Sequence, residues 1–418
     1  MTAQVTDVDV PAAGDTGGIG QAVRDYWARV RGGDIGSLPA VLGLIVLVVL
    51  FGTLEGSTFL SVFNFANLIN QSAAIIVLAM GLVFVLLLGE IDLSAGFAAG
   101  TSAAILAVAL NNWGLVWPLA LLAALLTGAV IGLTIGTLVA RLGIPSFVVT
   151  LAMFLALQGA MLLIIGEGGT IPIRSDAILV VMNGNMPVWA GWLLAIIIVG
   201  GFALTTLLAI RRRRKAGLPA EAMSVWAIKV IALGVLIFAA TYLLNQERQL
   251  PSAKIVIQGV PWVIVVILVL LVGLTFILQR TGFGRHVYAV GGNREAARRA
   301  GINVKGLMIT CFIFCSTLAA VAGVLLASRD NSVSPTTGGA QTLLFAVGAA
   351  VIGGTSLFGG RGKIRDAVIG GLVIAVIANG LPLITQQSGI QFVVTGLVLL
   401  VAASVDAISR RRAAATGR

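Results

Sequence analysis

Two carboxylates interrupt an apolar run that extends from Leu68 to Leu110. They are Glu90 and Asp92, in the segment Gly89-Glu-Ile-Asp-Leu-Ser-Ala-Gly96. Helices seldom continue through such a segment, and its glycines permit a break. Asp92 or Ser94 could cap the helix that follows, and the broken backbone could line a pathway for a polar solute. The alternative is a short cytoplasmic turn in which both acids are solvated.

A second group of residues predicts a short basic helix over Arg294–Ala300. Asn293 is a good N-cap and Gly301 a good residue to end the helix. Glu295 and Arg299 have the spacing of a favourable i,i+4 ion pair. Because so short a helix is marginal alone, we expect docking to hold it, with a cytoplasmic motor as its natural contact. The alternative is a solvated basic loop.

A third segment rich in glycine reads Gly353-Gly-Thr-Ser-Leu-Phe-Gly-Gly360 and is followed by Arg361-Gly-Lys-Ile-Arg365. It separates two apolar runs, as the first segment does, and it loosely repeats the glycines of that segment. Transporters often contain internal repeats with broken helices at related positions. Three matches in eight positions of a glycine-rich chain arise equally well by chance.

Several kinds of chemistry are excluded. Gly362-Lys363 is not a phosphate-binding loop, because Ile364 follows it and Leu357 stands where the first glycine is needed. One His and two Cys make a metal site or a disulfide framework improbable. No convergent catalytic set is visible, and the centres of the apolar runs carry almost no charge. We therefore expect no enzyme, no bound cofactor and no ion coupling, and an energy source on another subunit.

The elements that position these segments are predicted to be membrane helices. Of the 418 residues, 58% are hydrophobic and only 10% charged, too few charges to cover a soluble protein of this size. The fold class is all-α, a polytopic integral membrane protein with about ten to twelve transmembrane helices and possible broken or re-entrant helices. The candidate spans are Leu38–Leu54, Leu68–Leu88, Leu93–Leu110, Leu115–Ala140, Phe147–Ile165, Val188–Ile210, Val225–Leu244, Val260–Leu278, Leu307–Ala327, Ala340–Phe358, Ala367–Ile384 and Ile390–Ile408.

The charges predict the orientation. If all spans cross, 23 of the 27 Lys and Arg lie on one side, which is then the cytoplasmic side and holds both termini. The net charge of +11 then needs no nucleic acid to explain it. The expected regions are a cytoplasmic, mostly disordered tail (1–37), a transmembrane domain (38–409) and a basic cytoplasmic tail (410–418). The transmembrane domain includes an inserted basic stretch with a hairpin (211–258) and a long cytoplasmic loop (280–305).

Amide side chains in or near the spans have two possible roles, because solute hydroxyls and helix interfaces both need hydrogen-bond partners. They are Asn64, Asn67, Asn70, Gln71, Gln158, Asn379, Gln386 and Gln391.

Four blocks together resemble the permease subunits of bacterial ATP-binding-cassette monosaccharide importers, the ribose/arabinose/xylose group. They are GEIDLSAG (89–96), YAVGGNREAARRAG (288–301), GGTSLFGGRGKI (353–364) and NFANLINQ (64–71). Glu90 replaces a glycine of the family's pattern, and Ala95 replaces a valine. The inserted stretch Arg211–Gln258 is similar to the architecture of xylose permeases.

The resemblance implies a homodimer in the cell membrane, a cytoplasmic ATPase with two nucleotide-binding domains, and an extracytoplasmic sugar-binding protein. Xylose is the first substrate expected. The alternative is a self-sufficient secondary transporter or channel. The residues expected to couple to the ATPase are Gly291, Gly292, Asn293, Arg294, Glu295, Ala296, Arg298 and Gly301. The candidates for the pathway or for broken helices are Gly89, Glu90, Asp92, Ser94, Gly96, Gly353, Gly354 and Gly360.

Overall fold

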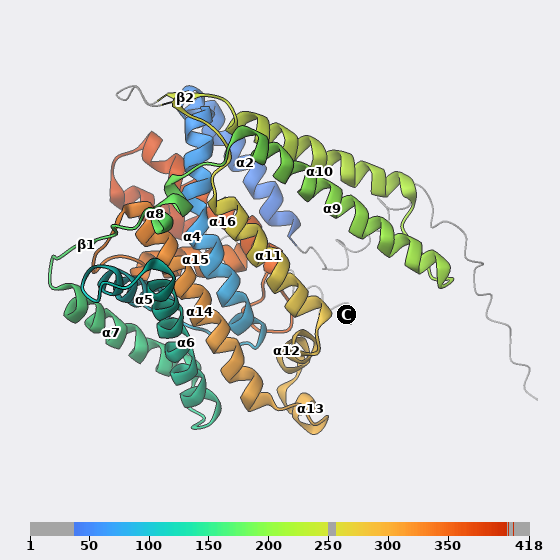
Figure 1. Ribbon diagram of the computed structural model, residues 1–418. Coiled ribbons are helices and arrows are strands. Elements are labelled where there is room, and N and C mark those ends of the chain that lie inside the picture. The colour runs from blue at the N-terminus through green and yellow to red at the C-terminus, as the bar shows by residue number, and fades with distance from the viewer. Residues whose placement is uncertain (1–36, 250–255, 399, 401–403, 405–418) are drawn as a thin grey trace, which may run out of the picture.

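The computed structural model describes residues 37–249, 256–398, 400 and 404 (Figure 1). The described chain is mainly helical, which confirms the all-α prediction. Both expected tails lie outside the described residues, except for residue 37, the last of the first tail (1–37); the second tail is 410–418.

The helices occur in the following order: α2 (Leu38–Leu54), α3 (Gly56–Phe59), α4 (Val62–Leu87), α5 (Ala95–Asn111), α6 (Trp117–Ala140), α7 (Ser146–Ile165), α8 (Asp176–Asn183), α9 (Val188–Lys215), α10 (Met223–Leu244), α11 (Val263–Arg280), α12 (Gly282–Gly292), α13 (Arg294–Arg299), α14 (Val304–Asp330), α15 (Gly339–Gly353) and α16 (Ile364–Ile384). An apolar helix over Ser388–Val398 follows them. The strands are β1 (Ile171–Pro172), β2 (Arg248–Gln249), β3 (Val256–Ile257) and β4 (Ser332–Val333), and they pair as β1 with β4 and β2 with β3, both antiparallel.

Over the residues that the structure describes, each predicted apolar segment coincides with a helix, and of Ile390–Ile408 the helix at Ser388–Val398 covers the first part. Within the described residues, eight helices are long and apolar enough to cross a membrane, namely α4, α6, α7, α9, α10, α11, α14 and α16. Four shorter apolar helices are α2, α5, α15 and the helix at Ser388–Val398. The fold is therefore that of a multi-pass membrane protein, and two of the short helices, α5 and α15, stand beside the predicted breaks.

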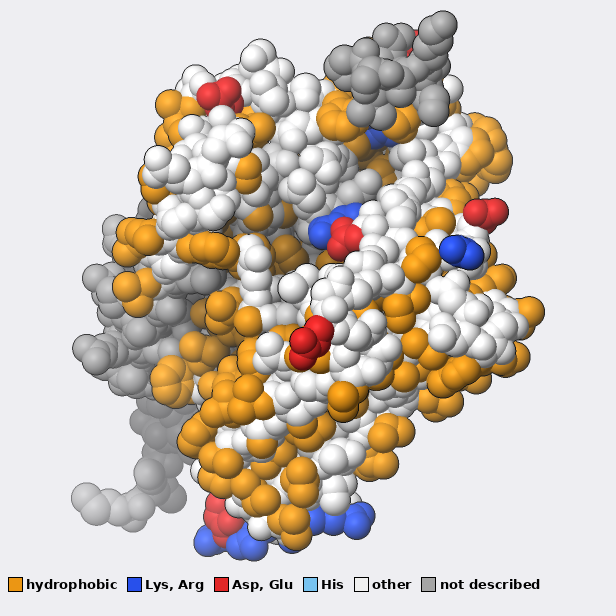
Figure 2. Space-filling model, turned by 90° about the vertical axis from the view of Figure 1, so that its left-hand side faces the viewer, with side chains coloured by type: hydrophobic (Ala, Val, Ile, Leu, Met, Phe, Trp, Pro, Cys, Tyr) orange, Lys and Arg blue, Asp and Glu red, His pale blue; other side chains and the backbone are white. Residues whose placement is uncertain are grey.

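The helices form a buried centre and an apolar periphery. In α4, 78% of the residues in the most apolar 18-residue stretch are buried, whereas in α9 the corresponding share is only 11%. The peripheral hairpin of α9 and α10 projects from the body (Figure 1). One flank of the molecule is covered mainly by hydrophobic and uncharged side chains, with several Lys and Arg at its lower end and a few charged side chains farther up (Figure 2). Because a lipid solvent favours apolar surface, the exposed side chains of the periphery face the bilayer.

The packing of α6 against α14 depends on a stripe of small residues. Gly128, Gly132 and Gly136 lie one turn apart on α6. A Cβ atom at Gly132 would lie 2.4 Å from the carbonyl oxygen of Phe312, on α14. Only glycine permits so close an approach of the two backbones. The three glycines of α6 therefore form a small-residue packing face.

Both predicted breaks occur. The chain leaves α4 at Leu87 and resumes helix at Ala95. It leaves α15 at Gly353 and resumes at Ile364. The predicted span Ala340–Phe358 was too long at its end, because Gly354 has a φ of +120°, which stops the helix.

Two ends of the molecule can be told apart. The basic end carries α12 and α13, and β2 lies at the opposite end (Figure 1). The predicted basic run Arg211–Lys215 forms the last residues of α9, and the turn after it leads into α10.

Candidate functional site

The helix predicted over Arg294–Ala300 is present as α13, and its ends form as predicted. The Asn293 side chain accepts a hydrogen bond from the backbone N–H of Ala296 at 2.9 Å. Gly301 has a φ of +84°, a conformation that ends the helix at little steric cost. Gly292 precedes the cap with no neighbouring atom within 4 Å of a Cβ placed there. Asn293 and Gly301 therefore define the two ends of α13.

The surface of α13 carries an exposed charge cluster. Glu295 accepts from Arg298 at 2.8 Å and from Arg299 at 3.2 Å, which confirms the predicted i,i+4 pair. The hydrogen bond from Arg298 lowers the pKa of the Glu295 carboxyl group. All three side chains are more than half exposed. The cluster is therefore open to contact by another molecule.

The first break lies against α13. Gly89 turns the chain with a φ of +74° directly after α4, and Glu90 follows it. Arg294 donates a hydrogen bond from Nη2 to the Glu90 carboxylate at 2.5 Å. The Glu90 side chain is only 12% exposed, whereas that of Arg294 is 47% exposed. An ion pair thus links the break between α4 and α5 to the first residue of α13.

The second break meets the first at one carbonyl group. The backbone N–H of Gly360 donates to the carbonyl oxygen of Leu87, the last residue of α4, at 2.9 Å. Gly291, in the last turn of α12, packs on the same group, since a Cβ there would lie 1.9 Å from that oxygen. The three predicted segments are therefore adjacent, although they are far apart in the chain. We call this place the junction, formed by Leu87, Gly89, Glu90, Tyr288, Gly291, Arg294, Phe358, Gly360 and Gly362.

A further hydrogen bond joins α12 to the second break. The Tyr288 hydroxyl donates to the carbonyl oxygen of Gly362 at 2.7 Å. Burial, together with the nearby Asp366 carboxyl group, raises the pKa of Tyr288, so the hydroxyl stays protonated as a donor. Phe358 lies in the same turn with 75% of its surface exposed, and its backbone contacts Gly89.

Four members of the junction were not among the predicted site residues: Leu87, Tyr288, Phe358 and Gly362. Tyr288, Phe358 and Gly362 lie inside the blocks that carry the family resemblance, which was the available signal. Leu87 contributes only its backbone, so its sequence context held no signal.

Asp92 is separated from the junction by its burial. It is 0% exposed, and the Cys315 thiol, near the middle of α14, lies beside its carboxylate. Its Oδ1 accepts from the Ser94 backbone N–H at 2.9 Å and from the Ser94 hydroxyl at 2.6 Å. The alternative of two solvated acids is therefore wrong for Asp92. The Ser94 side chain does not cap α5 and binds Asp92 instead.

Two other glycines of these segments, Gly96 and Gly353, serve helix packing. A Cβ at Gly96, in the first turn of α5, would lie 2.2 Å from the carbonyl oxygen of Gly339. One at Gly353 would lie 1.8 Å from the carbonyl oxygen of Asp366. These residues bring α5 against α15, and α15 against α16, outside the junction.

The structure also shows the role of some of the Asn and Gln side chains in or near the spans. Asn64 and Asn379 exchange two side-chain hydrogen bonds, of 2.7 and 2.9 Å, and Asn379 also donates to Gln71 at 3.3 Å. Both asparagines are buried. They bind each other across α4 and α16, which is the helix-interface role rather than the solute role.

The chain is similar to known membrane transport proteins. Residues 64–403 match a family model described as "Branched-chain amino acid transport system / permease component". The xylose transport system permease protein of Haemophilus influenzae is 35% identical over 372 residues, 89% of this chain and 96% of that protein. The ribose import permease protein of Escherichia coli is 30% identical, over 88% of this chain and 92% of the relative.

The fructose import permease protein of Rhizobium meliloti is 31% identical over 381 residues, 90% of this chain and 88% of the relative. No solved structure matches the chain. The family model covers well over half of the chain, and the relatives are matched over nearly their whole length. The chain therefore belongs to the permease-component family of membrane transport systems.

Proposed function

We propose that the chain is the membrane permease subunit of an ATP-driven importer of a monosaccharide, with xylose as the first substrate. The observation that carries the proposal is the junction, because α13 contacts the first helix break there and α12, which directly precedes it, contacts the second. Support for the sugar comes from the relatives, which are named as xylose, ribose and fructose permeases. The xylose relative has the highest identity of these three.

The junction offers a route from an ATPase to the pathway. A displacement of α13 would pull on the break after α4 through the pair of Arg294 and Glu90. The same displacement would press on the Leu87 carbonyl group through Gly291, and on the break before α16 through the Tyr288 hydrogen bond. Since packed elements transmit small shifts as rearrangements of whole helices, both breaks would respond together.

The ATPase is expected to dock on the basic end. The exposed Phe358 belongs to the turn that contacts Gly89, and the next residue, Glu90, pairs with Arg294 of α13. Arg and aromatic side chains are the commonest anchors of protein interfaces. The excess of Lys and Arg at this end makes it the cytoplasmic end, with both termini inside. A second permease copy completes the membrane unit, and a sugar-binding protein delivers the substrate on the opposite side.

Reconstitution in liposomes tests this function. The chain is incorporated with its ATPase and binding protein, and uptake of xylose, ribose, fructose and leucine is compared. We expect ATP-dependent xylose uptake and stimulation of ATP hydrolysis by the sugar-loaded binding protein. Uptake by the chain alone, driven by an ion gradient or by concentration, would establish the secondary-transporter alternative. Preference for leucine would overturn the choice of sugar.

The docking surface has its own test. Phe358→Ala should weaken co-purification of the ATPase by about ten-fold, the effect of losing one interface anchor. Phe276→Ala is the matched control, because Phe276 is equally aromatic and 61% exposed but lies on α11, a membrane helix. Equal ATPase yield from the two variants would remove Phe358 from the interface.

A further inference from the structure

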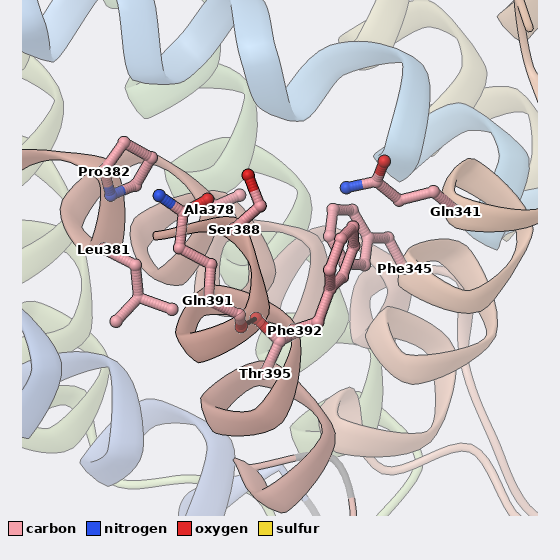
Figure 3. Close-up of a pocket in the computed structure, with 9 residues that line it drawn as sticks. All are labelled: Gln341, Phe345, Ala378, Leu381, Pro382, Ser388, Gln391, Phe392 and Thr395. Atoms are coloured by element: carbon pink, nitrogen blue, oxygen red, sulfur yellow. Dashed lines mark hydrogen bonds between the residues drawn. The ribbon is translucent and has the colours of Figure 1, made fainter. Parts of the chain in front are cut away.

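A cavity of about 260 Å³ lies between α15, α16 and the helix at Ser388–Val398 (Figure 3). Ala378, Leu381 and Pro382 contribute from the last third of α16, and Gln341 and Phe345 from the first half of α15. The opposite ends of these two helices, the end of α15 and the start of α16, flank the second break, which belongs to the junction. The cavity therefore lies in the half of the molecule away from the basic end.

The walls of the cavity are polar but uncharged. Figure 3 shows Gln391 and Ser388 on one side and Gln341 on the other, with the rings of Phe345 and Phe392 between them. The remaining lining residues are Ala378, Leu381, Pro382 and Thr395. A few polar groups among apolar and aromatic side chains are typical of a small-molecule site. Without a lining charge, the site suits a neutral ligand.

The hydrogen bonds inside the walls leave acceptors for a ligand. Gln391 uses its amide N–H in a 2.7 Å bond to the Thr385 carbonyl oxygen, which leaves Oε1 as an acceptor. Thr395 donates its hydroxyl proton to the backbone carbonyl oxygen of Gln391 at 2.7 Å, which leaves lone pairs on the Thr395 hydroxyl oxygen. Ligand hydroxyl groups could donate to both.

The backbone adds another acceptor. Pro382 lies inside α16 and has no N–H, so it cannot donate to the carbonyl group of Ala378, four residues earlier. Ala378 itself lines the cavity. The break in the helical hydrogen-bond pattern thus coincides with the site.

We propose that this cavity binds one monosaccharide ring in transit through the membrane, an inference that rests on the proposed function. Hydroxyl groups of the sugar pair with the amide, hydroxyl and carbonyl groups of the walls, and its apolar ring face packs on Phe345 or Phe392. The volume is below the roughly 300 Å³ at which sites for larger ligands begin, so a single ring fits best.

Two other occupants fit the walls less well. A free amino acid carries two charges, and none of the lining residues could pair with them. A lipid acyl chain would cover the polar groups without satisfying their hydrogen bonds. The chemistry of the cavity therefore favours a sugar over the cargo named in the family description.

Substitution in the assembled complex tests the site. Gln341→Leu should lower xylose uptake about three- to ten-fold, the effect of losing one hydrogen bond. ATP hydrolysis stimulated by the loaded binding protein should persist, because the junction is untouched. Gln386→Leu is the matched control, since Gln386 lies near the site but does not line it. Equal uptake by Gln341→Leu and the control would overturn the inference about the cavity. The proposed function would still stand in that case, provided that the wild-type complex takes up xylose.

Thiol labelling gives an independent readout that needs no transport. Ser388→Cys places a thiol at the cavity, and the native Cys311 and Cys315 are buried and should react slowly. Added xylose should slow modification of the new thiol, and Phe345→Ala in the same background should abolish that protection. If the labelling rate does not respond to xylose but changes with lipid composition, lipid occupies the cavity, and the proposal is refuted.

Discussion

Glu90 and Asp92 are only two residues apart, but they face different surroundings. Glu90 pairs with Arg294 near the surface of the basic end, whereas Asp92 is buried and binds Ser94 beside α14. One acid therefore connects the break to α13, and the other holds the broken backbone inside the protein. The chain between them descends from the surface into the core within two residues.

A charge reversal at the junction should separate transport from ATP hydrolysis. Glu90→Arg places two cations side by side and should lower sugar uptake per ATP by about ten-fold. Because the Arg294 side chain is 47% exposed and can turn its charge toward water, the variant should still assemble. The swap Glu90→Arg with Arg294→Glu restores the attraction and should recover much of the uptake. Uptake and hydrolysis are measured together in liposomes.

The control for this experiment is Glu167→Arg, which reverses an exposed acid at the opposite end of the molecule. It should leave uptake per ATP unchanged. If the swapped pair performed no better than Glu90→Arg alone, the two residues would act independently, and the junction would not couple through this contact.

The buried amide pair should contribute to stability rather than to transport specificity. Asn379→Leu leaves the buried Asn64 side-chain oxygen without its donor and should destabilise the protein by about 1–3 kcal/mol. Thermal unfolding in detergent measures the loss. The double variant Asn64→Leu/Asn379→Leu should lose less than the sum of the single variants, since it removes the unpaired Asn64 oxygen together with its donor. Strict additivity would show that the pair is not coupled.

The roles of the amide side chains could not be predicted from the sequence. Asn64 and Asn379 are 315 positions apart, so their contact depends on how α4 and α16 pack. The same limit applies to Gln391, whose position in the cavity depends on two neighbouring helices. By contrast, the ends of α13 were predictable, because Asn293 and Gly301 act on their own backbone.

At the scale of the helices, the contact between α6 and α14 is sensitive to volume. Gly132→Leu inserts a side chain where the Phe312 carbonyl oxygen lies 2.4 Å from the first added carbon. Overpacking of this kind costs about 1–3 kcal/mol or more, so the unfolding temperature should fall. Gly200→Leu is the matched control, because a Cβ at Gly200 on α9 has no neighbour within 4 Å. Similar losses in both variants would show that the glycine stripe is not a packing face.

The helices themselves were largely predictable, because long apolar runs in a chain with few charges have to span the bilayer. The breaks were predictable where glycines and polar residues interrupt those runs, as at Gly89 and Gly354. Their meeting at the Leu87 carbonyl group was not, since nothing in a local sequence window indicates which loop reaches which helix end. The short length of α15 had a local cause, the positive φ of Gly354.

At the scale of the whole molecule, the distribution of charge defines two ends. The basic end carries α13 and the exposed Phe358, and the turn after Arg211–Lys215 extends from the peripheral hairpin. The opposite half carries the strand pairs and the cavity. In the proposed complex, the ATPase binds the basic end and the sugar-binding protein binds the opposite end. Because the ATPase is cytoplasmic, the basic end must then be cytoplasmic.

Cysteine labelling from the two sides of the membrane tests this orientation. Ala216→Cys lies in the exposed turn between α9 and α10, and Glu167→Cys lies in the exposed loop after α7. Cys311 and Cys315 are 0% exposed, so the background labelling should be low. An impermeant thiol reagent applied outside intact cells should label Glu167→Cys and spare Ala216→Cys until the membrane is opened. The reverse pattern would invert the molecule and place α13 outside, where no ATPase could reach it.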